Sequence, residues 1–350
     1  MYHSRFESLG AYLPTRSVTT KELISSLAHE PSFDFEAITG VAERRVRSTD
    51  PDDYEDSYAL ALKAARDCLS RSQYSADQLD AVVSVSITRF GEDGEHIYYE
   101  PSFASMIAKE LGADNALHFD LSNACAGMLT GTYLMDAMIR SGAITNALVV
   151  SGESITPISD TAVRELSGGY DPQFASLSVG DSGAAVVLDR SESEDDRIHY
   201  VDLFTAAEHA DACLGMPSDQ TAGVALYTDN RRMHNEARFK LWTDGQADHL
   251  AAQGKTFADE EFDYIIHHQF GASAVAFMNQ LGEREFGVPM PEPLNVIEKY
   301  GNTSSTSHFV VLADHLRAGN VKHGAKVLMV PAASGIVTGY LSASISNLEA

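Results

Sequence analysis

The chain of 350 residues is 44% hydrophobic and carries a formal net charge of −25, and its length suits one large domain or two fused halves. Its longest apolar runs, such as AAVVL, are far shorter than the roughly 20 residues of a membrane-spanning helix. The first residues, MYHSRFESLG, lack the basic and then apolar order of a secretion signal, and an odd number of cysteines does not form a disulfide framework. We therefore expect a soluble, reduced, cytoplasmic protein.

The acidic residues are dispersed along the chain rather than gathered in a tail. Such a surface repels nucleic acids, anionic membranes and acidic carrier proteins, so neither a nucleic-acid nor a membrane partner is expected. A local basic patch can override this global field. The densest basic cluster contains Arg44, Arg45 and Arg47, and a second contains Arg231 and Arg232.

Helical and strand patterns alternate along the first half of the chain. Apolar residues recur at helical spacing in 57–72 and 125–142, and the segment 101–112 has proline in its first turn and glycine past its end, as helices usually do. The segments expected to be strands are 79–87, 116–122, 146–154 and 183–191. A glycine-bearing loop is expected at 90–94, and a polar surface loop or linker at 189–197.

The second half repeats this rhythm. Helices are expected over about 228–255, 273–282 and 305–321, and a strand over 262–269. The segment 326–345 has the pattern of two strands joined through a turn of small residues. Alternating βα units predict α/β layers with a largely parallel sheet. Because both halves share this order, we expect an internal duplication, with an N-terminal half at 1–190 and a C-terminal half at 191–350.

Cys125 lies in LSNACAGM (121–128), at the junction of a predicted strand and a predicted helix. A thiol at a helix N-terminus meets the positive end of the helix dipole and free N–H groups, and both favour the thiolate. A lone cysteine is also commonly a buried structural residue, and this motif alone allows both interpretations. Cys68 fits a helical apolar pattern and is expected in the core, whereas Cys213 lies in a loop-like region and is assigned no chemistry.

Three stretches of the second half also carry reactive residue types. His268, in HHQFGAS (267–273), lies where a strand ends and a helix begins, the place where α/β folds put reactive groups; a metal pair or a solvated strand end are the alternatives. Asn302, in YGNTSSTS (300–307), is either an amide donor or a helix cap. The turn in AASGIVTGY (332–340) either directs backbone N–H groups into an oxyanion hole or is a tight hairpin.

Taken together and in this order, the motifs make the chain resemble the ketoacyl synthase III-type (FabH-like) condensing enzymes of the thiolase superfamily. The matching stretches are TGVAERR (39–45), SNACAGM (122–128), GDSGAAVVL (180–188), HQFGAS (268–273), YGNTSSTS and AASGIVTGY. The resemblance runs from about residue 5 to the end, and it is more specific for the family than for the substrate. It implies a thiolase-like fold in which two duplicated halves pack as αβαβα layers, in a homodimer.

The resemblance also implies a role for each motif residue. Cys125 would take an acyl group as a thioester, a task that suits a thiolate nucleophile. His268 and Asn302 would hydrogen-bond the carbonyl of a second thioester and stabilise the enolate; His268 is preferred to His267 because neighbouring strand residues point in opposite directions. The backbone N–H groups of Cys125 and Ser334 would hold the oxyanion. Acyl and malonyl thioesters of coenzyme A or acyl carrier protein would be the substrates, with no metal and no resident cofactor.

The sequence departs from the family pattern at several positions. The aromatic residue and the arginine that grip the nucleotide of coenzyme A are replaced at about Asp34 and Ile38, and an arginine associated with carrier docking is replaced near Ser273. In IYYEPSFAS (97–105), Glu100 stands where the family usually has an apolar residue, on a loop inserted into the partner's active site.

The EPS of this stretch resembles that of head-to-head (OleA-like) condensing enzymes, in which the glutamate acts as the base. A carboxylate in an apolar pocket has a raised pKa that suits a general base. The alternative is an exposed acid beside a helix start, and the sequence favours neither.

Three functions follow from these motifs. The first is decarboxylative condensation with a malonyl-type thioester, in fatty-acid or specialised-metabolite biosynthesis. The second is non-decarboxylative head-to-head condensation or acyl transfer, with Glu100 of the partner subunit as the base. The third is a non-catalytic subunit of a heteromeric synthase, which the presence of Cys125, His268 and Asn302 together disfavours.

Overall fold

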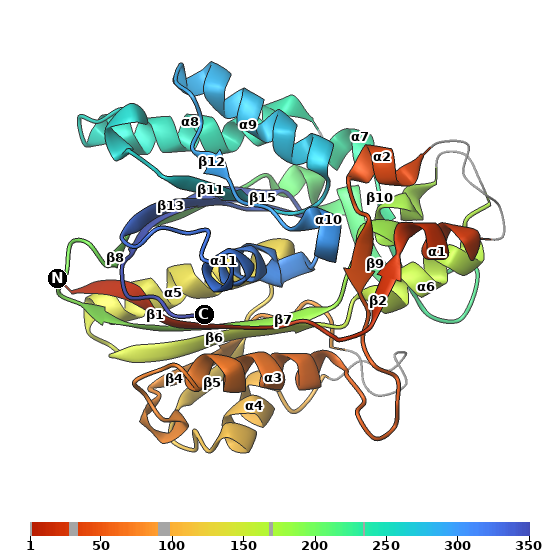
Figure 1. Ribbon diagram of the computed structural model, residues 1–350, viewed down its shortest axis with the longest axis horizontal. Coiled ribbons are helices and arrows are strands. Elements are labelled where there is room, and N and C mark those ends of the chain that lie inside the picture. Colours follow the sequence, from red (N-terminus) through yellow and green to blue (C-terminus); the bar gives the residue numbers. More distant parts are fainter. Residues whose placement is uncertain (1, 28–33, 90–98, 168–170, 234) are drawn as a thin grey trace.

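The computed structural model describes residues 2–27, 34–89, 99–167, 171–233 and 235–350, and its architecture rests on two mixed β-sheets (Figure 1). The glycine-bearing loop expected at 90–94 lies outside the described residues. The first sheet contains β1 (His3–Tyr12), β4 (Ala81–Ser84), β5 (Leu117–Asp120), β6 (Asn146–Glu153) and β7 (Ser182–Ser191). The second contains β8 (Arg197–Thr205), β11 (Tyr264–His267), β12 (Glu292–Pro293), β13 (Ala325–Val330), β14 (Ala332–Ala333) and β15 (Val337–Ile345).

The two sheets have the same strand order. It is β1-β7-β6-β4-β5 in the first and β8-β15-β13-β11-β12 in the second, where β14 also pairs with β15. In each sheet the first strand pairs antiparallel with the last, and the second and third strands pair in parallel at the opposite edge. The expectation of a largely parallel sheet is therefore wrong. The sheets are mixed because β7 and β15 pair antiparallel with all of their neighbours, whereas β4 and β11 pair in parallel with both of theirs.

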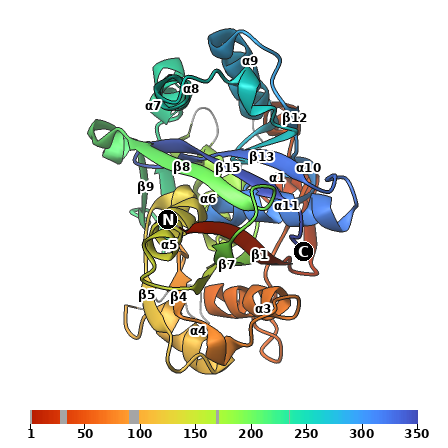
Figure 2. The ribbon, with the colours of Figure 1, turned by 90° about the vertical axis from the view of Figure 1, so that its left-hand side faces the viewer.

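Helices cover both outer faces of the sheet pair and fill the space between the sheets (Figures 1 and 2). The first sheet is covered by α3 (Ser57–Leu69) and α4 (Phe103–Leu111), the middle layer is α5 (Gly127–Ser141) and α11 (Ser307–Arg317), and the second sheet is covered by α8 (Glu236–Ala252) and α9 (Ala272–Phe286). In the middle layer, Phe6 of β1 meets Phe309 of α11 edge to face, with 5.6 Å between the ring centroids. This αβαβα arrangement confirms the fold class that the motifs imply.

Shorter elements complete the chain, and most of them lie at one end of the sheets (Figure 1, right). They are α1 (Thr20–Ser25), α2 (Phe35–Thr39), α6 (Thr156–Glu165), α7 (Asn230–Met233), α10 (Ile297–Tyr300), β2 (Ser17–Thr19), β3 (Glu43–Arg45), β9 (Cys213–Pro217) and β10 (Val224–Thr228). Short 3₁₀ turns are η1 (Ala76–Gln78), η2 (Ala124–Ala126), η3 (Pro172–Ser178), η4 (Ala207–Ala212), η5 (Ala258–Glu260) and η6 (Ser304–Thr306).

Three expectations are corrected by these bounds. The helix expected over 228–255 is two helices, because the side chain of Asn235 caps a new start for α8. Cys213 begins strand β9 instead of lying in a loop, since its backbone pairs with β10. The loop expected at 189–197 is shorter than predicted: Arg5 forms ion pairs with Asp189 (2.8 Å) and Asp196 (2.9 Å), which lets both strand ends carry buried acids.

A buried hydrogen-bonded seam joins the two halves. We define the seam as Ser151, Glu153 and Ser182 of the first half with Ser305 and Thr306 of the second. The Ser305 hydroxyl donates to the Glu153 carboxylate and lies 2.7 Å from the Ser151 hydroxyl, and the hydroxyls of Ser182 and Thr306 are 2.6 Å apart. Glu153 also accepts two backbone N–H groups from the segment after β4, at 3.0 and 3.1 Å. Burial raises the pKa of Glu153 and these hydrogen bonds oppose the rise, so the seam holds a fully buried carboxyl group with satisfied partners.

Glycines in three adjacent strands let α3 lie directly on the first sheet. A Cβ at Gly10 would meet the backbone nitrogen of Cys68 at 2.3 Å, one at Gly152 would meet the backbone oxygen of Ser57 at 2.0 Å, and one at Gly183 would meet the backbone oxygen of Leu60 at 2.2 Å. These contacts are with backbone atoms, which cannot rotate away. The helix-to-sheet distance therefore depends on the absence of side chains in this row.

Replacement of Gly10 by alanine tests this close contact. We expect G10A to lower the free energy of unfolding by about 1–3 kcal/mol, because the added methyl group must displace α3. Denaturant titration monitored by circular dichroism measures the change. The control is G215A, where the nearest atom to the new Cβ is a leucine methyl group at 3.8 Å; equal stability of G10A and G215A would contradict the argument.

Candidate active site

Cys125 lies in the turn η2, directly before helix α5 and shortly after strand β5. This is the strand–helix junction that the sequence predicts. The preceding Ala124 adopts a left-handed φ of 45°, a conformation that costs a residue with a side chain about 1 kcal/mol. The turn is held by packing: Cys125 and Ala126 contact Ala333 and Val337, which lie on either side of the β14–β15 turn. The two halves of the chain thus meet at the thiol.

The thiol of Cys125 is protonated in the free protein. Burial raises its pKa to about 12, the neighbouring Ser304 hydroxyl lowers it, and Cys213 and Glu153 raise it further. Burial thus opposes the effect of the helix start, which the sequence predicts to favour the thiolate, because the charged sulfur would lose its hydration. Any reaction of this thiol must supply the stabilisation of its anion.

Asn302 is held beside Cys125 by the turn η6. Its backbone N–H donates to the carbonyl of Ser178 at 2.9 Å, and its own carbonyl accepts the N–H of Gly180 at 3.1 Å. Its side-chain oxygen accepts the backbone N–H of Ser304 at 2.9 Å, while the Ser304 hydroxyl lies 3.8 Å from the Cys125 sulfur. The side-chain oxygen of Asn302 thus caps the turn, and the NH₂ group of the amide remains as a hydrogen-bond donor.

The two adjacent histidines face different surroundings, as the strand alternation predicts. His267 hydrogen-bonds Asn279 through Nε2 at 2.8 Å and meets the ring of Trp242 edge to face. His268 instead stacks on Phe270 and on His308 of α11, with centroid distances of 5.8 and 5.9 Å. Burial lowers the pKa of His268 well below its ordinary value, so His268 is neutral. Its contact with His308 brings it to the same helix start as Asn302.

Ser334 and Glu100 differ in their relation to this group. Ser334 lies partly buried in the turn between β14 and β15, whose flanking residues contact Cys125. The segment is thus a hairpin, as one interpretation of this stretch predicts, and the residues flanking its turn lie against the cysteine. Glu100 is exposed on the segment just before α4. In the described part of the chain its carboxylate is not enclosed in an apolar pocket, and the preceding residues 90–98 lie outside the described residues.

Arg238 lies in α8 and is only 7% exposed, and no motif in the sequence marks it as a site residue. Its guanidinium donates to the carbonyl of Ala333 at 2.8 Å and to the carbonyl of Met233. Among the described residues no carboxylate lies within ion-pair distance of it. Burial lowers its pKa to about 10, and the thiols of Cys125 and Cys213 oppose this change, which places all three groups in one electrostatic environment. One arginine on a predicted helix carries no signal that distinguishes it from a solvated residue.

Three of the positions that depart from the family pattern, Asp34, Ile38 and Ser273, lie close together on the surface. The Asp34 side chain caps α2 by accepting the N–H of Ala37 at 3.0 Å, and Ile38 is 52% exposed. The Ser273 hydroxyl of α9 donates to the carbonyl of Ile38 at 3.1 Å. This face of α2 and α9 thus offers an acid and an apolar side chain where the family pattern has aromatic and basic ones.

The described part of the chain contains neither a cluster of metal-ligating side chains nor a membrane-spanning helix. Within it, no group of three or more His, Cys, Asp or Glu side chains could hold a metal ion. No helix there is both long enough and apolar enough to cross a bilayer. The other two cysteines are reduced as well, and Cys68 is completely buried, as the sequence predicts.

Comparison with known proteins places the chain in a family. The family model for 3-oxoacyl-[acyl-carrier-protein] synthase III matches residues 119–207, and the model for the C-terminal part of the same synthase matches residues 252–344. Together the two matches cover more than half of the chain. They include the stretches around Cys125, His268, Asn302 and Ser334.

Whole-length relatives and solved structures agree with this placement. The beta-ketoacyl-[acyl-carrier-protein] synthase III 2 of Halalkalibacterium halodurans is 25% identical over 338 residues, 95% of this chain and 94% of the relative. The synthase III of Aquifex aeolicus is 27% identical over 339 residues, 94% of this chain and 96% of the relative.

Among solved structures, FabH from Pseudomonas aeruginosa superposes with a TM-score of 0.80 at 22% identity, covering 99% of this chain and 100% of that one. A cysteine-to-serine variant of Xanthomonas campestris OleA, crystallised with lauric acid and lauroyl-CoA, gives 0.82 at 22% identity, covering 98% and 99%. At these identities the two structures establish the thiolase-like fold alone. The family models, which match more than half of the chain, show that it belongs to the 3-oxoacyl-[acyl-carrier-protein] synthase III family and is an acyltransferase-type enzyme.

Proposed function

We propose that the chain loads an acyl group on Cys125 and condenses it with a malonyl-type thioester, in fatty-acid or specialised-metabolite biosynthesis. One observation carries this proposal: Cys125, Asn302 and His268 converge on the start of α11. Ser304 contacts both Cys125 and Asn302, and His308 stacks on His268. The proposed substrates are acyl and malonyl thioesters of coenzyme A or acyl carrier protein, the proposed location is the cytoplasm, and no resident cofactor takes part.

In the first half-reaction the Cys125 sulfur attacks the carbonyl carbon of an acyl thioester. The carbon–sulfur bond to the carrier breaks, and the proton lost by Cys125 ends on the departing thiol. The tetrahedral oxyanion would be held by the backbone N–H groups of Cys125 and Ser334. The η2 turn and the β14–β15 turn, which are in contact, support this assignment.

In the second half-reaction a malonyl thioester loses carbon dioxide, and its electron pair forms an enolate. His268 and the NH₂ group of Asn302 would donate hydrogen bonds to the enolate oxygen. A neutral histidine suits this task, because it donates without giving up its proton. The enolate carbon then attacks the acyl carbon, and the Cys125 thiolate leaves and is reprotonated. No step in this route requires a carboxylate base, which agrees with the exposed position of Glu100.

Arg238 has an electrostatic part in this scheme. A buried guanidinium without a carboxylate partner is unfavourable unless an anion faces it. The anions of the proposed reaction, the Cys125 thiolate above all, arise only during turnover. Stabilisation that acts only on a species of the reaction path lowers the barrier and not the ground state. Arg238 would thus offset part of the high pKa of the Cys125 thiol.

The alternative function, head-to-head condensation, would require a homodimer. Strand β5 is the edge of the first sheet, and side chains near this edge are apolar and exposed: Ile87 is 37%, Leu117 51% and Tyr133 44% exposed. Unpaired strand edges and apolar patches are usual at subunit interfaces. We propose that two copies associate along β5, which would carry Glu100 of the partner subunit toward Cys125. The EPS sequence favours head-to-head condensation as the second candidate function.

Acyl loading and the need for a malonyl donor can be tested separately. Incubation with an acyl-CoA should add the acyl mass to Cys125, and condensed product should form only when malonyl thioester is present. Intact-protein mass spectrometry and product chromatography measure the two steps. C125A should give no adduct, whereas C213A should be loaded normally. No adduct on Cys125 with a series of acyl-CoAs from short to long chains would support the non-catalytic subunit instead.

A substitution at Glu100 distinguishes decarboxylative from head-to-head condensation. If product forms without malonyl thioester, E100Q should abolish that product and leave acyl loading of Cys125 intact, because the amide cannot remove a proton. The matched control is E110Q, on the exposed face of α4, which should behave like the unmodified protein. Product formation by E100Q at an undiminished rate would show that Glu100 is not the base.

The reactivity of the Cys125 thiol should depend on pH. Its pKa of about 12 means that thiolate increases as pH rises, so the alkylation rate should increase about tenfold per pH unit between pH 7 and 10. In a C213A background, R238M should slow alkylation at least about tenfold, equivalent to about 1.4 kcal/mol, because the thiolate loses its facing cation. R238K should retain most of the rate. An unchanged rate in R238M would assign Arg238 a structural role only.

A further inference from the structure

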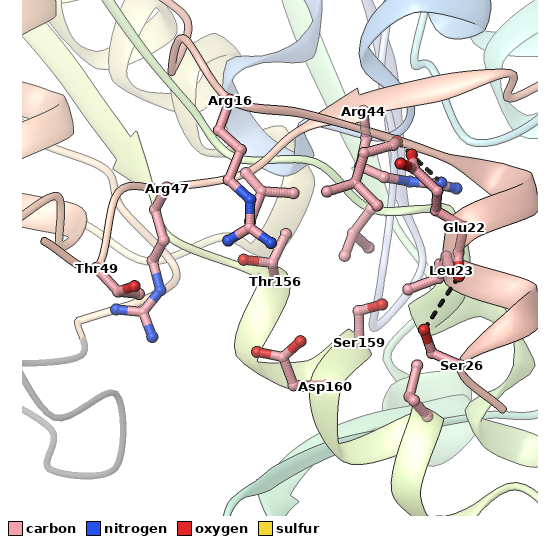
Figure 3. Close-up of a pocket in the computed structure, with 14 residues that line it drawn as sticks. Arg16, Glu22, Leu23, Ser26, Arg44, Arg47, Thr49, Thr156, Ser159 and Asp160 are labelled. Carbon is pink, nitrogen blue, oxygen red and sulfur yellow. Dashed lines mark hydrogen bonds between the residues drawn. The ribbon is translucent and has the colours of Figure 1, made fainter. Parts of the chain in front are cut away.

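A cavity of about 320 Å³ lies apart from the Cys125 site, between the β2–β3 segment, α1 and α6 (Figure 3). None of Cys125, His268, Asn302 and Arg238 lines it. The lining residues are Arg16, Val18, Glu22, Leu23, Ser26, Arg44, Val46, Arg47, Thr49, Thr156, Ser159, Asp160, Val163 and Val179. This cavity collects two arginines of the densest basic cluster in the sequence, a cluster for which the proposed reaction has no use.

The three arginines of the cavity are without carboxylate partners among the described residues. Arg44 is 1% exposed and donates only to neutral oxygens, those of Thr20, Leu177 and Val18. Its Nε has no hydrogen-bond partner in the described chain. Burial lowers the pKa of Arg44 to about 10, so it stays charged at neutral pH. In a protein with 50 acidic residues, a buried cation left unpaired is a costly arrangement.

Arg47 and Arg16 extend toward the same space from the strand side (Figure 3). Arg47 is 8% exposed, and its guanidinium donates to the hydroxyl of Tyr54, a neutral group. Arg16 is exposed at the rim. Neither lies within ion-pair distance of a carboxylate of the described chain. Within the described residues, three guanidinium groups therefore line one cavity without ion pairs and keep hydrogen-bonding capacity for an anion.

The two acids of the cavity do not neutralise these arginines. Glu22 is engaged in the capping of α1, where its carboxylate accepts the backbone N–H and the hydroxyl of Thr19 at 2.8 and 2.7 Å. Asp160 faces the arginines across the space in Figure 3 without direct pairing. Burial raises the pKa of Asp160, while Arg47 and Arg16 lower it. The lining thus carries three guanidinium groups against two carboxylates, and both carboxylates oppose an incoming anion.

The wall of the cavity is apolar. Val18, Leu23, Val46, Val163 and Val179 supply it, and the volume is at the lower end of the range for small-molecule sites, about 300–1,000 Å³. The start of α6 is already occupied, because the backbone N–H and the hydroxyl of Thr156 donate to a buried aspartate at 2.8 and 2.6 Å. Recognition would therefore depend on the arginines and the apolar wall, and not on a helix terminus.

We propose that this cavity binds a compact organic anion, with a carboxylate or phosphate head held by Arg16, Arg44 and Arg47 and a short alkyl body against the valines. The site is independent of the proposed condensation, since it shares no lining residue with the Cys125 group. The two sites are nevertheless adjacent, because Val179, in the wall of the cavity, forms an isolated β-bridge with Asn302.

Isothermal titration calorimetry of the full chain tests the site with four probes: hexanoate, hexyl phosphate, inorganic phosphate and the neutral hexanol. We expect saturable binding of at least one of the two alkyl anions, and the comparison of hexanoate with hexyl phosphate identifies the preferred head. Inorganic phosphate should bind more weakly than hexyl phosphate, and hexanol should not bind. Equal binding of hexanol and the anions, or no saturable binding of either alkyl anion, would overturn the proposal.

Variants connect the binding to the cavity. R16A and R47A should each weaken binding about tenfold, through loss of charge-assisted hydrogen bonds, and R16A is at an exposed position where the fold is not at risk. D160N should tighten binding several-fold, because it removes the opposing charge. The matched control is R45A: Arg45 is adjacent in sequence but packs on Tyr300, outside the cavity. Unchanged affinity in R16A and R47A, or an equal loss in R45A, would overturn the assignment.

Discussion

The buried seam between the halves is the constraint on which the rest of the site depends. The Glu153 carboxyl group is completely buried and hydrogen-bonded to Ser305 and to the segment after β4. A carboxyl group in that position is tolerated only when its partners are in place. The seam therefore sets where η6 lies against the first sheet. Asn302 lies just before that turn and Ser304 begins it, so their positions near Cys125 follow from it.

The electrostatics of the site form a consistent pattern. Cys125 is a protonated thiol and His268 is a neutral imidazole, both because burial disfavours their charged forms. Arg238 is the charged group beside them, and it has no carboxylate partner among the described residues. A site of neutral donors and one buried cation is prepared for negative charge that arises during a reaction. The chemistry proposed for this family, with its oxyanion, enolate and thiolate, produces that kind of charge.

Much of the architecture could be predicted from local patterns. The strand–turn–helix context of Cys125, the opposite surroundings of His267 and His268, and the layered α/β class follow from periodicity and punctuation, which depend on nearby residues. The mixed pairing of the sheets, the break before α8 and the β9 pairing of Cys213 were not predicted, because they depend on partners distant in sequence. The sequence shows the helix start that favours the Cys125 thiolate, but not the burial that raises the pKa of this thiol.

By itself, the sequence determined the order of motifs and therefore the family, because residues such as Cys125 and Asn302 occur in short stretches whose composition is distinctive. Tertiary structure alone decided which groups share an environment. Arg238 meets Cys125 only through the contact of α8 with the β14–β15 turn, and Arg16 meets Arg44 and Arg47 only around a cavity between α1 and α6. The physical reason is that desolvation and Coulomb interactions depend on distance in space, which separation along the chain does not report.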